Sequence, residues 1–298
     1  MKRAWASLPD LDLFGSERPL TGKKVLVVRI PGFLDQFPVL VAESLKKMGN
    51  VCRIADVTVP EFSALTGTSG VVRSISIAKM MEQPEVLDAF IRALSDAVSD
   101  SEVAVLPQVF GLKSDDALRQ VRDTVPSEVL FFNTMTPSVP GNRLYSQLRT
   151  AYEDAGGVFV PGTARSADVV RDMVMSVTVE GMEECVEADS FMLATGSFVS
   201  RGLQSSPETI SEAVFGLDVD FNEDRGEWIS GDMDDRQPFN TYGVRTDASF
   251  HPSLGGVTIS NLYAAGSVLS GADSLYEGSG AGVAGVTAMR VADLIPGR

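Results

Sequence analysis

The feature that most constrains the fold is an alternation, between residues 24 and 132, of short apolar runs with longer segments of helical spacing. Continuous apolar runs are typical of strands buried on both faces, and they lie at residues 24–30, 103–106 and 129–132; residues 51–59 predict a further strand. Apolar residues at helical spacing predict helices at residues 34–48, 75–81, 86–98 and 115–125. Strands that alternate with helices imply a parallel sheet with right-handed crossovers.

The pattern of residues changes after this alternation. Residues 133–143 are rich in turn formers and predict a polar loop, and residues 144–155 predict a helix ended by two glycines. We therefore place a domain boundary near Gly156, with an α/β parallel-sheet domain at residues 1–156 and a second domain at 157–298. In the second domain, residues 174–179 and 185–188 predict a hairpin, and residues 190–193 a short strand.

Three stretches of the second domain are poor in side chains. The strand at 190–193 runs into Ala194-Thr195-Gly196, and a later apolar strand ends in Tyr263-Ala264-Ala265-Gly266. Gly278-Ser279-Gly280-Ala281-Gly282 then opens a helix-like run to Ile295. Small residues let backbone N–H groups approach an anionic or carbonyl-rich ligand. The stretches therefore predict a nucleotide or flavin pocket, for which they must converge in space. The alternative is that the glycines only let a helix pack closely on a sheet.

The composition argues against several functional classes. The formal net charge of −15 disfavours nucleic acid and anionic membrane surfaces, because both are bound through clusters of Lys and Arg. The two cysteines, Cys52 and Cys185, belong to no C-x-x-C pair, so we expect no zinc site, no iron–sulfur cluster and no other metal. No stretch approaches the ~20 apolar residues that span a bilayer, so we expect a soluble, cytoplasmic protein.

Most of the chain resembles a known family. The resemblance covers residues 23–62, 133–162, 191–198, 215–219, 225–228 and 242–295. Its most specific pieces are Thr134-Met-Thr-Pro-Ser-Val-Pro-Gly141, Arg225-Gly-Glu-Trp228 and Asn261-Leu-Tyr-Ala-Ala-Gly-Ser-Val-Leu269. With these motifs the chain is similar to the B subunit of the anaerobic glycerol-3-phosphate dehydrogenase, a flavoprotein related to the fumarate reductase class.

The resemblance implies both a fold and a function. The fold would be α/β, with a parallel-sheet Rossmann-like domain and, at residues 157–298, the remainder of an incomplete FAD/NAD(P)-binding-type flavin domain with a β-hairpin. The chain would be the electron-transfer subunit, carrying FMN or, as the second choice, FAD. The enzyme would oxidise sn-glycerol 3-phosphate to dihydroxyacetone phosphate and pass electrons to menaquinone, then to fumarate or nitrate. Its partners would be the FAD-containing catalytic A subunit and the iron–sulfur C subunit, which holds the complex at the inner face of the cell membrane.

The resemblance also implies roles for single residues. Ala194, Thr195 and Gly196 would line one side of the flavin, and Ala264, Ala265 and Gly266 would run past its ribityl or phosphate group. Glu277 and Gly278 would begin the last helix, where backbone amides stabilise negative charge on the reduced ring; ordinary capping is the alternative for Glu277. Gly280 and Gly282 would form the distal flavin contact. Apart from the resemblance, the guanidinium of Arg143, at the end of the polar loop, has the geometry to bind an anionic substrate. No catalytic residue is assigned.

One departure from the family is serious. Relatives begin with a strand and a G-x-G-x-x-G turn that binds the cofactor phosphate, and here no such turn follows a strand-like run. The first βαβ unit would be missing through truncation or supplied by another chain, so we expect the isolated chain to bind flavin weakly or not at all. Two alternatives stay open: a cofactor-free scaffold that docks the catalytic and iron–sulfur partners, and a small-ligand-binding module built from residues 24–155.

Overall fold

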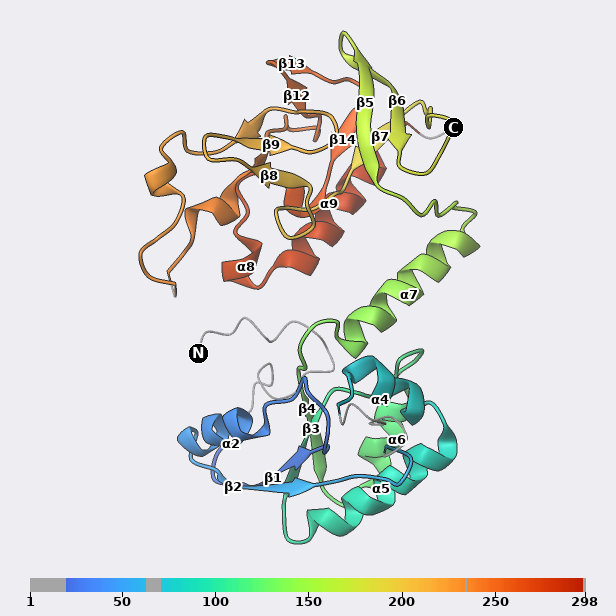
Figure 1. Cartoon of the computed structure of the whole chain (residues 1–298), viewed down its shortest axis with the longest axis vertical. Helices are drawn as coiled ribbons and strands as arrows, with labels where there is room; N and C mark the ends of the chain where they lie inside the picture. The colour runs from blue at the N-terminus through green and yellow to red at the C-terminus, as the bar shows by residue number, and fades with distance from the viewer. Residues whose placement is uncertain (1–19, 63–70, 234, 297–298) are drawn as a thin grey trace. The chain divides into compact units, whose positions relative to one another are not determined.

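The computed structural model describes residues 20–62, 71–233 and 235–296 of the chain. These residues form two compact units, one ending at Phe159 and the other beginning at Val160 (Figure 1). Each unit has its own hydrophobic core, and the two are described separately below.

The first unit is built on a parallel sheet of four strands. In chain order these are β1 (Lys24–Arg29), β2 (Val51–Asp56), β3 (Val103–Pro107) and β4 (Glu128–Phe132). They lie side by side in the order β2-β1-β3-β4, and every neighbouring pair is parallel. The predicted parallel α/β sheet is therefore confirmed.

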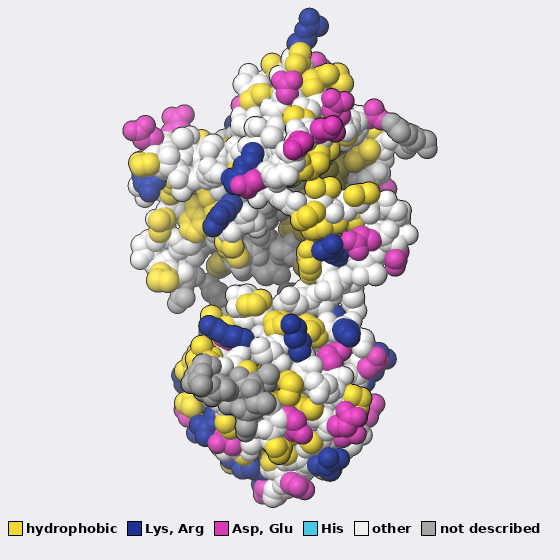
Figure 2. Space-filling model, turned by 45° about the vertical axis from the view of Figure 1, so that its right-hand side comes forward, with side chains coloured by type: hydrophobic (Ala, Val, Ile, Leu, Met, Phe, Trp, Pro, Cys, Tyr) yellow, Lys and Arg dark blue, Asp and Glu magenta, His cyan; other side chains and the backbone are white. Residues whose placement is uncertain are grey.

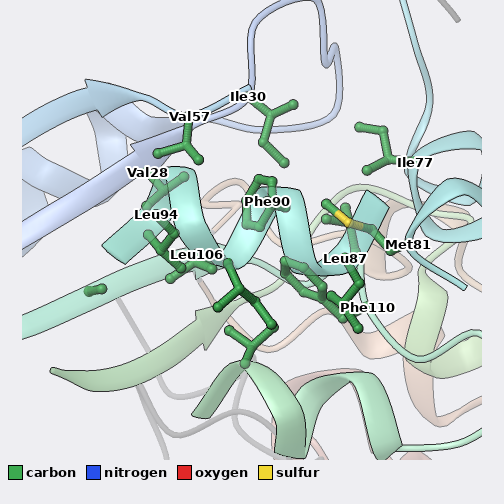
Figure 3. Close-up of a cluster of buried hydrophobic side chains, with 14 of the residues drawn as sticks. Val28, Ile30, Val57, Ile77, Met81, Leu87, Phe90, Leu94, Leu106 and Phe110 are labelled. Carbon is green, nitrogen blue, oxygen red and sulfur yellow. The ribbon is translucent and has the colours of Figure 1, made fainter. Parts of the chain in front are cut away.

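Helices cover both faces of this sheet. Helix α2 (Pro38–Lys47) packs on one face, and α4 (Ser74–Met81), α5 (Pro84–Val98) and α6 (Asp116–Thr124) pack on the other. Alternate residues of each strand point to opposite faces, so the strands contribute to two separate clusters of buried side chains. Figure 3 shows the larger cluster, in which four of the residues are Val28, Phe90, Leu94 and Leu106.

Two predicted boundaries in this unit are wrong. Helix α2 starts at Pro38, later than the predicted residue 34, because proline fits the first helical turn but not the interior. Helix α7 (Val139–Asp154) starts inside the predicted loop at 133–143. Its N-cap is Ser138, whose hydroxyl accepts a hydrogen bond from the Gly141 N–H at 3.2 Å. The proline and glycine that suggest a loop therefore lie in the first helical turn.

The second unit opens with an antiparallel hairpin of β5 (Ala164–Val170) and β6 (Met173–Val179). The predicted hairpin had the wrong partner strand, because β6 pairs along its length with β5. The segment at 185–188 contributes a single bridge, between Val177 and Val186. Strand β5 alternates small, polar and apolar residues and lacks a continuous apolar run such as that of β3 in the first unit.

The remaining elements of this unit are short. The central pair is β7 (Phe191–Leu193) beside β14 (Leu262–Ala264), which run parallel. Around it lie three antiparallel pairs: β8 (Leu203–Ser205) with β9 (Ile210–Glu212), β10 (Val219–Asp220) with β11 (Gly243–Val244), and β12 (Ser253–Leu254) with β13 (Val257–Thr258). The described chain ends in α8 (Ser274–Glu277) and α9 (Gly280–Leu294).

Asn261 joins the hairpin to the central strand pair. Its side-chain oxygen accepts a hydrogen bond from the Val174 N–H at 2.8 Å, and its amide donates to the Val174 carbonyl at 2.9 Å. Its own carbonyl accepts from the Phe191 N–H at 2.8 Å. Through its side chain and its backbone carbonyl, one buried residue thus holds β6 and β7 to the start of β14, which gives a structural reason for this residue at the head of its motif.

The surface carries both signs of charge. On the face in Figure 2, Lys and Arg side chains lie interspersed with Asp and Glu. Within the described ranges, no helix is both long enough and apolar enough to cross a membrane. The same residues contain no group of three or more His, Cys, Asp or Glu side chains placed to hold a metal ion.

Asp218 ties the turn between β12 and β13 to the rest of its unit. Its carboxylate accepts hydrogen bonds from the Ser253 hydroxyl at 2.7 Å and from the N–H groups of Gly255 and Gly256 at 2.9 and 2.8 Å. The Ser253 hydrogen bond, followed by that of Gly256, holds the pKa of the Asp218 carboxyl below its ordinary value of 3.8. A carboxylate with a depressed folded-state pKa stabilises the fold above its unfolded pKa, and this contribution is lost as the pH falls through the folded value.

We therefore expect Asp218→Asn to lower the free energy of unfolding by about 1–2 kcal/mol at neutral pH, because an amide replaces a charged acceptor of three donors. The difference from wild type should shrink as the pH falls below about 4 and should disappear once the pH is below the depressed folded-state pKa, where the native carboxyl is protonated as well. Urea unfolding of both proteins across this pH range measures the difference. Asp172→Asn, at an exposed position of the same unit, serves as the control, and an equal deficit for Asp218→Asn at all pH values would contradict the assignment.

Candidate functional site

The candidate site begins where two parallel strands end together. Strands β7 and β14 pair from Leu262 opposite Phe191 to Ala264 opposite Leu193. The pairing continues beyond the strands, since the Ala265 N–H donates to the Leu193 carbonyl at 2.9 Å. The backbone of Ala194-Thr195-Gly196 and that of Ala265-Gly266 therefore leave the same edge side by side.

Gly196 brings the two loops into contact. Its φ of +76° is a conformation that other residues rarely adopt. A Cβ built there would lie 2.6 Å from the Ser200 hydroxyl and 3.5 Å from that of Ser267. Since Ser200 follows β7 and Ser267 follows β14, the loops meet at a glycine that leaves no room for a side chain.

Gly266 joins the same place to helix α9. Its φ is +80°, its N–H donates to the Thr287 hydroxyl at 2.8 Å, and a Cβ there would lie 3.9 Å from Ala284. Helix α9 therefore packs on the turn after β14 through its second and third turns. The predicted convergence is confirmed for the segment near residue 195 and residues 265–267. For residues 278–282 it stays a prediction, as does the cofactor-binding role of all these residues.

The structure corrects the start of the last helix. Glu277 and Gly278 do not begin it: Glu277 is the last residue of α8, and Gly278, with φ +67°, is the C-cap of α8. Helix α8 forms because the Asp273 carboxylate caps it, accepting from the Tyr276 N–H at 3.1 Å, and a left-handed glycine ends it. The Glu277 carboxylate pairs with Arg236, accepting from its Nη2 at 3.0 Å, and also accepts a hydrogen bond from the Ser279 hydroxyl at 3.1 Å.

Helix α9 itself starts at Gly280, so its first turn carries little side-chain bulk. A Cβ at Gly280 would reach only Ser274, at 3.9 Å, and one at Gly282 would meet no heavy atom of the described residues within 4 Å. Close packing of the helix on a sheet therefore does not explain Gly282. Residues 280–285 have G-x-G-x-x-G spacing, but they lie inside the helix, well after β14, and do not form a strand–turn–helix phosphate loop.

Four buried polar atoms near these loops have no hydrogen-bond partner in the described part of the chain. They are Thr195 Oγ1, Asn240 Oδ1, Tyr242 Oη and Asp273 Oδ2. The Asp273 oxygen has Arg236 Nε 3.5 Å away as an ion-pair neighbour. Buried polar groups normally have hydrogen-bond partners. Several unpaired atoms in one region therefore indicate a place where a ligand or water supplies the missing hydrogen bonds.

Asn240, Tyr242 and Asp273 were missed in the sequence. They belong to the site because the Gly271 N–H donates to the Thr241 carbonyl at 2.8 Å, which holds the segment 238–242 against the loop after β14. An aspartate directly before a short helix is a capping signal that could have pointed to Asp273. Nothing in the sequence marks Asn240 or Tyr242, because their burial depends on long-range packing.

Gly202 closes the other side of the loop after β7. A Cβ at this position would collide with the Gly196 carbonyl oxygen and lie 2.6 Å from Thr195 Oγ1 and 2.9 Å from the Gly196 carbonyl carbon. The Thr195 hydroxyl thus lies in the space that a side chain at 202 would fill. The conformation of residues 195 and 196 depends on a glycine here.

Arg143 does not lie at the end of a solvent-exposed loop, as the sequence suggested. It is buried in α7 of the first unit, and its Nη1 donates to the Gly111 carbonyl at 2.6 Å. Because α7 starts at Val139, the guanidinium points into packed structure, where it holds the loop after β3. Its predicted role in binding an anionic substrate remains untested, and its geometry gives that role no support.

The residues of the second unit fit a flavin in two respects. The main chain at 194–196 and 265–266 is free of large side chains, so a planar ring system or its ribityl chain can approach it closely. The unpaired atoms of Thr195, Asn240 and Tyr242 offer hydrogen-bonding partners to such a group. We therefore expect these residues to hold a flavin if the unit binds one.

Comparison with known proteins gives a consistent picture. The sequence model of one family, described as an FAD binding domain, matches residues 1–283. This range includes both strands of the central pair and the first glycines of α9. No solved structure matches the chain.

The chain is also similar to curated proteins that are named as the B subunit of anaerobic glycerol-3-phosphate dehydrogenase. The protein from Pectobacterium atrosepticum is 32% identical over 295 residues, which cover 99% of this chain and 70% of the relative. The proteins from Yersinia enterocolitica and Vibrio vulnificus are each 32% identical, over 98% and 97% of this chain and 69% and 68% of the relatives.

Proposed function

The chain belongs to the FAD-binding-domain family that contains the B subunit of anaerobic glycerol-3-phosphate dehydrogenase, and on that premise we propose that it is the electron-transfer subunit of such an enzyme. As a member of this family it is a flavoprotein-type subunit of an oxidoreductase. The reaction we propose is oxidation of sn-glycerol 3-phosphate to dihydroxyacetone phosphate, in which the secondary alcohol loses two electrons and two protons. The electrons would pass to menaquinone and on to fumarate or nitrate.

A bound flavin supplies the redox chemistry, and the protein supplies binding, orientation and electrostatics. The residues after β7 and β14 would hold the ring system between two backbone segments. Gly196 and Gly266 keep that surface free of Cβ atoms. The Thr195 hydroxyl would donate to, or accept from, a polar edge of the ligand. Enclosure by these loops would exclude water from one side of the ring.

The observation that carries this proposal is the parallel pairing of β7 with β14, which brings residues 194–196 and 265–266 to one edge. The unpaired Thr195 hydroxyl at that edge supports it further. FMN and FAD share the ring system that these residues would contact. We propose FMN for the reason given by the family resemblance, while the name of the family domain favours FAD.

The relatives are named as B subunits, which implies other kinds of subunit in the complex. We propose an FAD-containing catalytic subunit and an iron–sulfur subunit as partners, the latter holding the complex at the inner face of the cell membrane. A cofactor-free scaffold role for this chain remains the competing proposal, favoured by the lack of a strand–turn–helix phosphate loop among the described residues. The two proposals differ in whether flavin binds to this chain.

The substitution Thr195→Val distinguishes the flavin-binding proposal from the scaffold proposal. In the assembled complex, loss of one hydrogen bond to the ligand should weaken flavin binding to this chain by about 3- to 10-fold, while the flavin-free chain keeps its stability because the hydroxyl has no protein partner to lose. Flavin content and affinity, measured by absorbance and fluorescence titration of the complex, provide the readout.

The matched control is Thr258→Val, which removes an exposed threonine hydroxyl from β13 of the same unit and should leave flavin binding unchanged. A complex whose flavin content is fully explained by its other subunits, with no change on Thr195→Val, would support the scaffold and contradict the flavin site.

A further inference from the structure

A second set of unpaired polar groups lies in the first unit, far from the candidate flavin residues in sequence. Asp35, Gln108 and Thr134 are 4%, 0% and 6% exposed. Four of their side-chain atoms have no hydrogen-bond partner among the residues that the structure describes: Asp35 Oδ2, Gln108 Nε2 and Oε1, and Thr134 Oγ1. Native proteins rarely leave one such atom unpaired, so a group of four requires an explanation.

The sheet topology brings these residues together. Asp35 follows β1, Gln108 follows β3 directly and Thr134 follows β4, so all three lie beyond the carboxyl ends of neighbouring parallel strands. The Gln108 N–H donates to the Phe132 carbonyl at 3.0 Å, and the Met135 N–H donates to the Asp35 carbonyl at 3.4 Å. Thr134 lies between the two residues that make these contacts.

This edge includes the switch point of the sheet. From β1 the chain passes to β2 on one side and then returns to β3 on the other side of β1. In open parallel sheets the two connections diverge at this point, and ligands bind outside the carboxyl ends of the strands there. Gln108 follows β3 and Asp35 lies in the loop after β1, so both stand at the switch point.

Neighbouring polar groups show that the fold can satisfy buried amides at this edge. Gln36, next to Asp35, donates to the Phe33 carbonyl at 3.3 Å and also to that of Ile30, and it accepts from the Ile30 N–H at 3.1 Å. Its buried amide is thus fully used in closing the loop after β1. The amide of Gln108, by contrast, makes no hydrogen bond to any described residue. Loop closure therefore does not explain a buried glutamine at position 108.

The chemistry of these unpaired groups limits the class of ligand that they could bind. Arg73 pairs with the other oxygen of Asp35. Because the negative charge of Asp35 is already balanced, a cation is not the expected ligand. An anion would be repelled by the free Asp35 oxygen. The unpaired groups comprise a carboxylate acceptor, an amide that donates and accepts, and a hydroxyl that does both. Ligand hydroxyl groups, which also donate and accept, complement all of them. Because these atoms are closed off from solvent, the ligand has to be small.

We propose that the carboxyl edge of the β2-β1-β3-β4 sheet is a binding site for a small polyol, held by hydrogen bonds to Asp35, Gln108 and Thr134. The site is independent of the flavin proposal, because its residues all belong to the first unit and no redox group takes part. The proposal gives the first unit a ligand-binding role of its own.

The test compares wild type with Gln108→Leu and Thr134→Val in the full chain, with glycerol as the probe. Without glycerol, Gln108→Leu should raise the midpoint of thermal unfolding by about 3 °C, since it removes two unpaired buried atoms. With glycerol, wild type should gain a saturable increase that both variants lose. The general stabilisation that osmolytes give is common to all three proteins and cancels in the comparison.

Two controls sharpen the result. Gln120→Leu changes an exposed glutamine of α6 and should keep the glycerol effect, and 1-propanol, with one hydroxyl, should not reproduce that effect. The Gln108 side-chain amide resonances should shift on glycerol addition in the ¹⁵N NMR spectrum. Equal glycerol effects in wild type and Gln108→Leu, or a lower unfolding midpoint for ligand-free Gln108→Leu with only an ordered water at the amide in a crystal structure, would overturn the proposal.

Discussion

Gly202→Ala is expected to destabilise the second unit by about 3 kcal/mol, at the upper end of the usual cost of overpacking, and to abolish flavin binding. The added methyl group would occupy the position of the Gly196 carbonyl oxygen and crowd Thr195 Oγ1 at 2.6 Å. Backbone cannot rotate away as a flexible side chain can, so the loop after β7 has to move. Its contact with the loop after β14 at Gly196 would then be lost. Urea unfolding measures the stability, and flavin titration of the assembled complex measures binding.

The control for this variant is Gly231→Ala in the same unit. Gly231 also lacks a positive φ, and a Cβ there would meet no described heavy atom within 4 Å. Its alanine variant should be within about 0.5 kcal/mol of wild type and should bind flavin normally. Normal flavin binding by Gly202→Ala would mean that the loop after β7 is not part of the cofactor site.

Phe90→Ala should give the largest loss of stability, about 3–5 kcal/mol, which is typical of a buried aromatic residue truncated to alanine. Phe90 is 0% exposed, and its ring lies 5.5 Å from that of Phe110 and 6.3 Å from that of Phe62, measured between centroids. It is the central member of the core between α5 and the sheet. Truncation would leave a cavity between the helix and the strands, with little freedom for the neighbours to fill it.

Hydrogen exchange shows where this loss falls. Each unit has its own buried clusters, so Phe90→Ala should speed amide exchange in β1 and β3 and leave β7 and β14 close to wild type. Phe37→Ala, which truncates a phenylalanine that is 49% exposed, is the control for loss of ring area at the surface. Equal acceleration in both units would mean that they unfold as one cooperative body.

The sequence predicted the first unit well because three of its strands, β1, β3 and β4, are buried on both faces. Such strands need apolar residues at every position, and the runs around Val25 and Val103 are visible without any structure. Strand β5 was not predicted because its residues are mostly exposed and alternate in polarity. The start of α7 was predicted too late because Pro140 and Gly141, which usually mark loops, also fit a first helical turn.

The candidate site could be predicted only in part, for a similar reason. Small residues at strand ends are a local signal, and they mark residues 194–196 and 264–266 in the sequence alone. The unpaired atoms of Asn240, Tyr242 and Gln108 are a property of the closed tertiary structure. No local pattern distinguishes a buried amide that has partners, such as Gln36, from one that has none.

The measurement that tests the central claim most directly is photolabelling of the assembled complex with an azido-substituted flavin, followed by mass spectrometry of this chain. The claim is that the backbone after β7, the turn after β14 and helix α9 form one flavin-binding surface. It predicts label in peptides that contain residues 190–204 and 262–287, competed by unmodified flavin. Competed label confined to residues 24–155, or none in this chain while the complex retains its flavin, would contradict it.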